Sequence, residues 1–481
     1  MKILLIRPPS GLKKILPMGI LYIAGYLKNA LPDLEIEIID LRQKTVTDND
    51  IADIIKKSAP DIVGISAVSM EANLVHSMIK VVKSVNIEIK VIIGGPYATS
   101  LSTRAVTDKN VYCCVIGEGE ATALEVIKLI KEGSTFDLST IKGIAYSKDG
   151  EYFKTLRREY IEDLDSIPMP AYDLIEISDY FRDFGTHSGF QAHREYSSIF
   201  SSRGCPYKCS YCHDIFGKKI RYHSAERILD EIKILYNKYG VREIHIEDDS
   251  FNINKERVKK IFNMIIDEGL KIKISFPNGI RVDHVNEEIL DLFTKVGVYK
   301  LAYGIETASP NIQKDINKNL DLELAKKNIK LTADRGIVTQ AFFMLGFLGE
   351  TMKELKSTIK YAASSDLHMA SFSFVIPQPG TPLYYQAIDA GFKFNNLDTD
   401  QLNPGDTEIN ISAVSIEELH LMRRAAYRKF YLNPVRMWRL YKVTPKKTVL
   451  FKSFMVFMTN ILPISSIMRE KAQGMLYKSN K

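Results

Sequence analysis

The sequence of 481 residues is too long for one ordinary domain and long enough for two or three, each with its own core. Hydrophobic residues make up 45% of it and charged residues 26%, which excludes disordered and collagen-like chains. The net charge of +7 is small for this length, and no dense basic stretch with interleaved aromatic residues accompanies it. Composition therefore predicts a globular protein with no nucleic-acid partner.

Residues 1–150 alternate short apolar segments with amphipathic ones, which is the pattern of parallel strands joined by crossover helices. Val, Ile and Leu fill the apolar segments without polar alternation, as expected of strands buried on both faces. We predict strands at 2–6, 36–41, 62–66, 90–93 and 111–116. The expected fold class is α/β, beginning with a doubly wound, Rossmann-like domain.

Small and turn-forming residues follow three of these strands. They are Ser66 and Ser69, Gly94 and Gly95, and Gly117 with Glu118. In an open parallel sheet the ligand crevice lies beyond the carboxyl ends of the strands, where Gly and Ser let a bulky ligand approach the backbone. Any one of these loops is equally explained as a tight strand-to-helix turn. Several of them at one sheet edge favour a cofactor domain.

Residues 151–190 mix charge with Pro168 and Pro170 and lack periodicity, so we predict a linker. Alternation resumes in residues 191–400. Strands are predicted at 197–201, 243–247, 271–276, 300–304, 339–345 and 371–376, with helices that include 225–239, 255–268 and 353–365. Repeated strand–helix units of this length predict a full or partial α/β barrel with its active site at the carboxyl ends of the strands.

Residues 401–481 are predicted to be helical and basic. The stretch 448–468 is largely apolar, but Lys452, Asn460 and Pro463 interrupt it, so we expect no membrane-spanning helix. Basic residues flank the stretch: Lys442, Lys446, Lys447 and Arg469. Two interpretations stay open, a helical cap over the active site and an interfacial helix in peripheral contact with a membrane.

The five cysteines are Cys113, Cys114, Cys205, Cys209 and Cys212, an odd and clustered set that is unlike a secreted disulfide framework. The apolar run at residues 3–6 is too short for a signal peptide, so we expect a cytoplasmic protein. The last three cysteines share one short loop and can bind three corners of an iron–sulfur cubane. No fourth cysteine is near, which leaves one iron open, as at catalytic metal sites.

A zinc site built from the same cysteines and His213 is the alternative. Adjacent residues such as Cys212 and His213 rarely point at one metal, and structural zinc usually pairs two separated pairs of ligands. Cys113 and Cys114 lie in a predicted strand of the other domain, where a buried structural role is expected.

The spacing Cys-x3-Cys-x2-Cys, with Tyr211 before the last cysteine, resembles the signature of the radical S-adenosylmethionine (SAM) superfamily. The resemblance implies a partial (β/α)6 barrel and a [4Fe–4S] cluster on Cys205, Cys209 and Cys212 whose fourth iron binds SAM. Segments at 246–251, 278–283, 303–307, 346–351 and 377–382 resemble later strand ends of the same superfamily.

The same resemblance implies roles for single residues. Tyr211 would lie near the adenine, and Asp248, Arg281 and Glu306 would hold polar groups of SAM. Each of these three charged residues is equally explained as part of a salt bridge at the barrel mouth.

A doubly wound domain before such a barrel resembles the cobalamin-binding class of the superfamily, on the segments 17–24, 94–96 and 117–120. The resemblance implies that Ser66, Ser69, Gly94, Gly95, Gly117 and Glu118 line a cobalamin site. The Asp-x-His-x-x-Gly motif that supplies a lower axial histidine is absent: His76 lies in a predicted helix, and Tyr97 follows Gly-Gly-Pro where many relatives carry histidine. We expect cobalamin without a histidine lower ligand.

The resemblance implies a methyltransferase that moves a methyl group from methylcobalamin to an unactivated carbon after hydrogen abstraction by a 5′-deoxyadenosyl radical. The alternative is an oxidative cyclase or ring-rearranging enzyme with the same cofactors. Methylthiotransferases need three more cysteines in the first domain, so that hypothesis fails on ligand count. Expected partners are a small-molecule or lipid-like substrate and an electron donor such as flavodoxin or ferredoxin. A non-enzymatic cobalamin or redox sensor is the remaining hypothesis.

Overall fold

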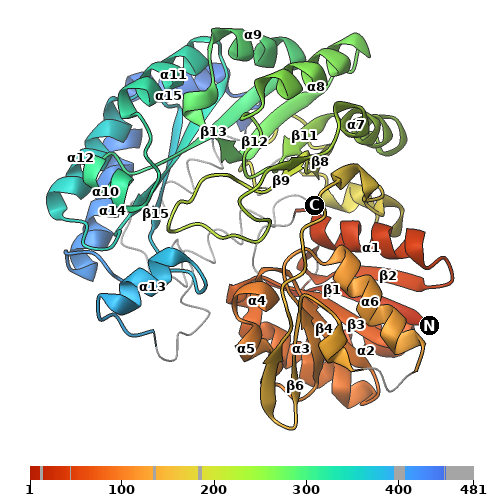
Figure 1. Cartoon of the computed structure of the whole chain (residues 1–481). Coiled ribbons are helices and arrows are strands. Elements are labelled where there is room, and N and C mark those ends of the chain that lie inside the picture. The colour runs from red at the N-terminus through yellow and green to blue at the C-terminus, as the bar shows by residue number, and fades with distance from the viewer. Residues whose placement is uncertain are drawn as a thin grey trace. The chain divides into compact units, whose positions relative to one another are not determined.

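The computed structural model describes residues 1–10, 15–43, 45–133, 137–182, 187–394, 407–448 and 450 (Figure 1). These residues form two compact units. The first comprises Met1–Tyr180 together with His213–Gly217, and the second comprises the other described residues from Phe181 onward. The predicted domain boundaries (1–150, 151–190, 191–400 and 401–481) stay predictions.

The first unit is built on a seven-stranded sheet of order β2-β1-β3-β4-β5-β6-β7. Its five parallel strands are β1 Lys2–Arg7, β2 Glu35–Asp40, β3 Ile62–Ser66, β4 Lys90–Gly94 and β5 Val111–Val115. The helices are α1 Met18–Ala30, α2 Asp48–Ser58, α3 Ala72–Val85, α4 Gly95–Ser100, α5 Ser102–Val106 and α6 Glu120–Lys131. The predicted α/β class and doubly wound arrangement are confirmed.

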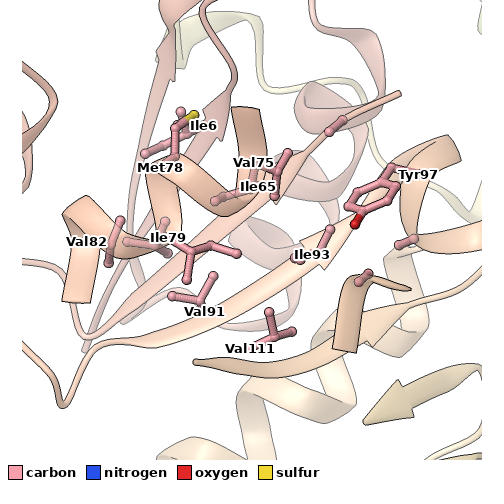
Figure 2. Packing of buried hydrophobic residues seen from close by; sticks show 14 of the residues in the cluster. Ile6, Ile65, Val75, Met78, Ile79, Val82, Val91, Ile93, Tyr97 and Val111 are labelled. Carbon is pink, nitrogen blue, oxygen red and sulfur yellow. The ribbon is translucent and has the colours of Figure 1, made fainter. Parts of the chain in front are cut away.

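Successive residues of a strand point to opposite faces of the sheet, and both faces here are covered. Leu4 and Ile6 of β1 belong to a core with α2, α3, α4 and α5, whereas Ile3 and Leu5 belong to a core with α1 and α6. Figure 2 shows the first of these cores, in which side chains of α3 pack on β1, β3 and β4. Burial on both faces explains why these strands carry continuous apolar runs.

An antiparallel hairpin that the sequence analysis did not predict closes one edge of this sheet. It consists of β6 Ile144–Lys148 and β7 Glu151–Lys154, and β6 pairs with β5. Beyond β7 the chain packs against α1, where the Ala171 amide donates to the Leu21 carbonyl at 3.0 Å. The first unit therefore extends to Tyr180, into the segment that was predicted as a linker.

The second unit contains a six-stranded, all-parallel sheet whose strands follow one another in sequence order. The strands are β8 Tyr196–Ile199, β11 Glu243–Ile246, β12 Lys273–Ile280, β13 Val298–Glu306, β14 Val338–Leu345 and β15 Met369–Phe374. The crossover helices are α7 Ala225–Tyr239, α8 Lys255–Asp267, α9 Glu287–Val296, α11 Leu322–Asp334 and α12 Met352–Ser364, with the short helices α10 Pro310–Asp315 and α13 Pro382–Asp389 beside them. This repeated unit confirms the predicted partial barrel.

The segment 187–193 runs along the inner side of this sheet. Its amides at Ala192 and His193 both donate at 2.8 Å to Glu243, the first residue of β11. At its other end His187 Nδ1 lies 2.7 Å from Glu247, just past the last residue of β11. The segment thus spans β11 from its amino to its carboxyl end, and only its His187 end lies where the active site of such a barrel is expected.

Two C-terminal helices, α14 Ile416–Tyr431 and α15 Pro434–Val443, follow the barrel. Side chains of α14 bond to the outer edge of β15: the Tyr431 hydroxyl receives the Ala370 amide at 3.1 Å and donates to the Ala370 carbonyl at 2.9 Å, and Arg423 Nε donates to the Phe372 carbonyl at 2.8 Å. An edge strand whose backbone groups are satisfied this way is closed to further pairing.

Within the described residues, no helix is long and apolar enough to cross a membrane. The stretch 448–468, which the sequence indicated as a possible interfacial helix, lies almost wholly outside the described residues.

We predict that Gly25→Ala destabilises the first unit. A methyl group at Gly25 of α1 would lie 2.4 Å from the Met169 carbonyl oxygen, so α1 or the segment after β7 would have to shift, at a cost of ~1–3 kcal/mol. Urea unfolding followed by circular dichroism measures the effect.

Gly19→Ala is the matched control, because it changes the same helix at a position with no atom within 4 Å. It should be neutral or stabilising by up to ~1 kcal/mol, as expected of Ala for Gly in a helix. Equal effects of the two substitutions would contradict the proposed packing of this segment on α1.

Candidate active site

The three-cysteine loop lies between two very short strands, β9 Ser202–Arg203 and β10 Arg221–Tyr222. Asp248 anchors its start: the carboxylate accepts the Ser201 amide and hydroxyl at 2.6 Å each and the Ser202 hydroxyl at 2.5 Å. Burial raises the pKa of Asp248 above its usual value, while Arg257 and the two serines act in the opposite direction. Asp248 was predicted to hold SAM, and in this structure it bonds to Ser201 and Ser202, which lead into the loop.

The loop is also fixed in its middle. The Ser210 amide donates to the Ile316 carbonyl at 2.9 Å, and the Ser210 carbonyl accepts the Leu383 amide at 2.8 Å. These contacts tie the loop to segments that follow β13 and β15. Because both anchors use the backbone, they hold the loop without constraining the cysteine side chains.

The three thiols meet different surroundings. Cys205 Sγ lies 3.1 Å from the Ser250 hydroxyl, and Cys209 Sγ lies 3.9 Å from the Asn317 carbonyl oxygen. Burial, with Asp249 and the other two thiols nearby, raises the pKa of Cys212 to about 12. A bound cation would reverse this shift, since metal coordination favours the thiolate.

Tyr207 and Arg281 cover one side of the loop. The Arg281 guanidinium lies 4.0 Å above the Tyr207 ring, and the Tyr207 hydroxyl is 2.7 Å from His284 Nε2. Arg281 Nε also donates to Asp283 at 2.9 Å, which holds the pKa of that carboxyl below its usual value despite burial. Arg281, which was predicted to hold SAM, therefore packs on Tyr207 of the cysteine loop and is paired with Asp283.

Tyr211 and Glu306, which the resemblance assigned to the adenine and to polar groups of SAM, share a neighbour in Lys318. Lys318 Nζ joins them, 3.3 Å from the Glu306 carboxylate and 3.4 Å from the Tyr211 hydroxyl. The Tyr211 ring meets Phe347 edge-on, with centroids 5.9 Å apart. Burial and the nearby Glu306 raise the pKa of Tyr211 well above its usual value.

The backbone at Glu306 is unusual. This residue ends β13 in the left-handed region, with a φ of +66°, which is costly for a residue with a side chain. A methyl group at Gly304 would lie 2.6 Å from the Glu306 carboxylate and 3.0 Å from Lys318 Nζ. Backbone strain at a strand end is typical of a functional site.

The sequence analysis assigned no role to four residues of this region, Lys318, Ser250, His187 and Glu247. Lys318 comes from a loop after α10 and carries no motif signal. Ser250 contacts Cys205, and His187 contacts Glu247, across long stretches of sequence. Glu247 also accepts the Ser198 hydroxyl at 3.1 Å. His187 and Ser198 lower the pKa of Glu247, which burial alone would raise.

Within the described part of the chain, no group of three or more His, Cys, Asp or Glu side chains is arranged to hold a single metal ion. A cubane makes a different demand, because each thiolate binds its own iron atom. The three cysteines of this loop are free, and the remaining two, Cys113 and Cys114, are buried in β5. The donor set thus fits a cluster with one open corner.

In the first unit, the predicted cofactor residues gather at the carboxyl ends of β3, β4 and β5. A methyl group at Gly94, or at Gly117 with its φ of +76°, would have no atom within 4 Å, so the backbone faces open space there. Ser66 and Ser69 end β3 and begin the next turn, and Gly95 packs so closely on Ser66 and Ala67 that a side chain would collide. Glu118 accepts the Ile161 amide at 2.9 Å.

His76 lies in α3, as predicted, with both ring nitrogens engaged. Nε2 is 2.8 Å from the Tyr97 hydroxyl and Nδ1 is 3.2 Å from Asp108. Tyr97 itself is fully buried in the core shown in Figure 2. His76 therefore has a structural role that leaves no nitrogen for a metal.

Sequence models of two protein families match the two halves of this arrangement. The Radical SAM superfamily matches residues 199–362, and the B12 binding domain matches residues 12–127. An uncharacterized methyltransferase of Pyrococcus horikoshii is 33% identical over 446 residues, which cover 90% of this chain and 93% of that protein. The chain belongs to the B12-binding radical SAM family of enzymes.

Two further proteins similar to this chain share less of its sequence. The anaerobic magnesium-protoporphyrin IX monomethyl ester cyclase of Rubrivivax gelatinosus is 26% identical, over 87% of this chain and 74% of the cyclase. The solved structure of the cobalamin-dependent radical SAM enzyme OxsB aligns with a TM-score of 0.71 at 17% identity, covering 99% of this chain and 74% of OxsB. That likeness confirms the fold.

As a B12-binding radical SAM enzyme, the protein uses a [4Fe–4S] cluster, SAM and cobalamin. The residues present fit these groups on two observations: the three free thiols on one anchored loop, and the open space beside Gly94 and Gly117.

We predict that Glu350 makes the enzyme less stable as pH rises. Burial raises its pKa to about 7, although the amides of Gly346 and Phe347 donate to the carboxylate at 2.7 and 3.1 Å. The unfolded chain loses this proton near pH 4.5, so stability falls between about pH 4.5 and 7, by about 3 kcal/mol in all.

Glu350→Gln should abolish this loss of stability with pH. The free energy of unfolding of the variant, relative to that of the unmodified enzyme, should therefore be higher at pH 8 than at pH 5. Urea midpoints at the two pH values measure the change. Glu176→Gln is the control, because the pKa of Glu176 is lowered and the residue belongs to the first unit. If the stability of Glu350→Gln depends on pH as strongly as that of the unmodified enzyme, ionisation of Glu350 does not destabilise the fold.

Proposed function

We propose that this enzyme is a cobalamin-dependent radical SAM methyltransferase acting at an unactivated carbon, with its cluster on Cys205, Cys209 and Cys212. The observation that carries the proposal is the anchored loop with three free thiols and no fourth cysteine within its unit. The Pyrococcus relative named as a methyltransferase, aligned over most of both chains, supports methyl transfer.

When bound, the cluster with SAM supplies a carbon-centred radical, and cobalamin carries the methyl group. The protein's own contribution is to hold groups in place. Glu306 and Lys318 offer a carboxylate and an ammonium to the polar groups of SAM, and Tyr211, wedged against Phe347, offers a ring for the adenine. Asp248 and Arg281 position the loop itself.

For the cobalamin site we propose a cradle of Ser66, Ser69, Gly94, Gly95 and Gly117, with Glu118 holding the neighbouring loop in place. We propose that no histidine serves as lower ligand, because both nitrogens of His76 have other partners. A cobalamin without a strong lower ligand suits methyl donation.

The second candidate is an oxidative cyclase with the same cofactors, which the relative from Rubrivivax gelatinosus favours. Both candidates take a small-molecule or lipid-like substrate and draw electrons from a donor such as flavodoxin or ferredoxin.

The function is tested by anaerobic reconstitution with iron, sulfide and cobalamin, followed by SAM and a strong reductant. We expect 5′-deoxyadenosine together with S-adenosylhomocysteine, and the latter only when cobalamin is present. Cys205→Ala should abolish 5′-deoxyadenosine and the iron–sulfur absorbance. Cys113→Ala, which changes a buried cysteine of the other unit, should retain both.

The two products distinguish the candidates. 5′-Deoxyadenosine without S-adenosylhomocysteine would favour the cyclase. If a cluster-loaded sample forms neither 5′-deoxyadenosine nor S-adenosylhomocysteine, the enzymatic proposal is overturned. A cluster that survives Cys205→Ala would overturn the ligand assignment.

We predict that Glu306→Gln weakens SAM binding without loss of the cluster. Removing one charged hydrogen-bond partner costs ~1.5–3 kcal/mol, which is a rise in Kd of roughly 10- to 100-fold. Equilibrium dialysis with the cluster-loaded enzyme measures the Kd. Glu354→Gln, a change on α12 away from the Tyr211–Lys318 contacts, is the control. An unchanged Kd for Glu306→Gln would remove Glu306 from the SAM site.

A further inference from the structure

The outer face of α15 carries large apolar side chains exposed to solvent. The helix packs inward through Arg436 and Leu440, which are 5% and 4% exposed. On its opposite face Val435 is 66% exposed, Trp438 58% and Tyr441 46%. Leu432, just before the helix, is 69% exposed. Positions 435, 438 and 441 are three residues apart within the helix, which places them along one side of it.

Two lysines and two aromatic rings form a stack on this face. The rings of Trp438 and Tyr441 lie parallel, with centroids 5.8 Å apart and planes 8° apart. Lys442 Nζ lies 5.1 Å from the Trp438 centroid, and Lys447 Nζ lies 4.5 Å from that of Tyr441. Rings and ammonium groups are thus presented together at the surface, which we call the α15 face (Leu432, Val435, Trp438, Tyr441, Lys442 and Lys447).

The sequence that contains this helix is depleted of acidic residues. Residues 419–469 contain no Asp or Glu, which the small net charge of the whole chain conceals. Basic residues recur through the same stretch: Arg423, Arg424, Arg428, Lys429, Arg436, Arg439, Lys442, Lys446, Lys447, Lys452 and Arg469. An apolar face that carries the ammonium groups of Lys442 and Lys447 attracts a partner that is both apolar and anionic.

The geometry points to an anionic lipid surface as that partner, and we propose that the α15 face docks the enzyme on it. Trp and Tyr are enriched where lipid headgroups meet acyl chains, and lysines beside them bind anionic headgroups. Leu432, Val435 and Trp438 are exposed to solvent in the folded protein, and contact with a lipid surface would bury them. This contact is peripheral and does not depend on the reaction that the enzyme catalyses.

The test is flotation of the full-length protein with vesicles of phosphatidylcholine alone or mixed with phosphatidylglycerol, at an ionic strength of ~0.15 M. We expect recruitment to the anionic vesicles. Each lysine near an anionic membrane is worth ~1 kcal/mol, so Lys442→Gln with Lys447→Gln should reduce partitioning roughly 25-fold. Trp438→Ala should also reduce it.

Lys238→Gln is the matched control, because Lys238 of α7 likewise lies over an aromatic ring, that of Tyr239 at 5.1 Å. It should leave partitioning unchanged. Circular dichroism and cluster content verify that each variant is folded.

Four outcomes would overturn the proposal: no recruitment of the unmodified protein, equal recruitment by neutral vesicles, equal recruitment of the double-lysine variant, or binding of single-stranded RNA in place of vesicles. Self-association that Trp438→Ala abolishes, without vesicle binding, would assign the face to a second copy of the chain.

Discussion

The cysteine loop has almost no secondary structure, and everything at the site depends on how the carboxyl ends of the barrel strands hold it. Asp248 carries the greatest part of this task because its carboxylate is buried and receives three hydrogen bonds from Ser201 and Ser202. Leaving such donors unsatisfied in a buried site costs ~1–3 kcal/mol each. A loop anchored at its start and at Ser210 can keep three thiols in place while leaving the metal side open.

The interior of the second unit is equally specific. Glu243 accepts two backbone amides of the segment 187–193 and the hydroxyl of Tyr299 at 2.7 Å. Lys300 reaches into the same interior, donates to the Ser188 carbonyl and lies 4.3 Å from the Phe190 ring. Buried charges of this kind require fixed partners, so Glu243 and Lys300 hold the segment 187–193 in one position inside the barrel. One consequence is that His187 and Glu247 are held at the end where the cysteine loop begins.

The first unit combines an extended sheet edge with open space at the carboxyl ends of its parallel strands. The hairpin β6–β7 extends the sheet beyond β5, while Gly94 and Gly117 leave open space beside the backbone at the carboxyl ends of β4 and β5. The Asp108–His76–Tyr97 contacts join α3 to the start of α4, next to that crevice. These contacts support the loops at Gly94 and Gly117, which carry no side chain of their own.

The sequence by itself determined the parallel strands of the two sheets and the cysteine loop. The strand at 62–66 and the helix at 225–239 have the predicted bounds, because buried strands and amphipathic helices leave local signals in the order of residue types. The loop was recognisable because its ligands are close in sequence. Only the tertiary structure decided that Asp248 faces the loop backbone, that Lys318 joins Tyr211 and Glu306, and that Tyr431 seals the edge of β15. These contacts join residues far apart in the chain, and a side chain's partner depends on which strand ends meet in space.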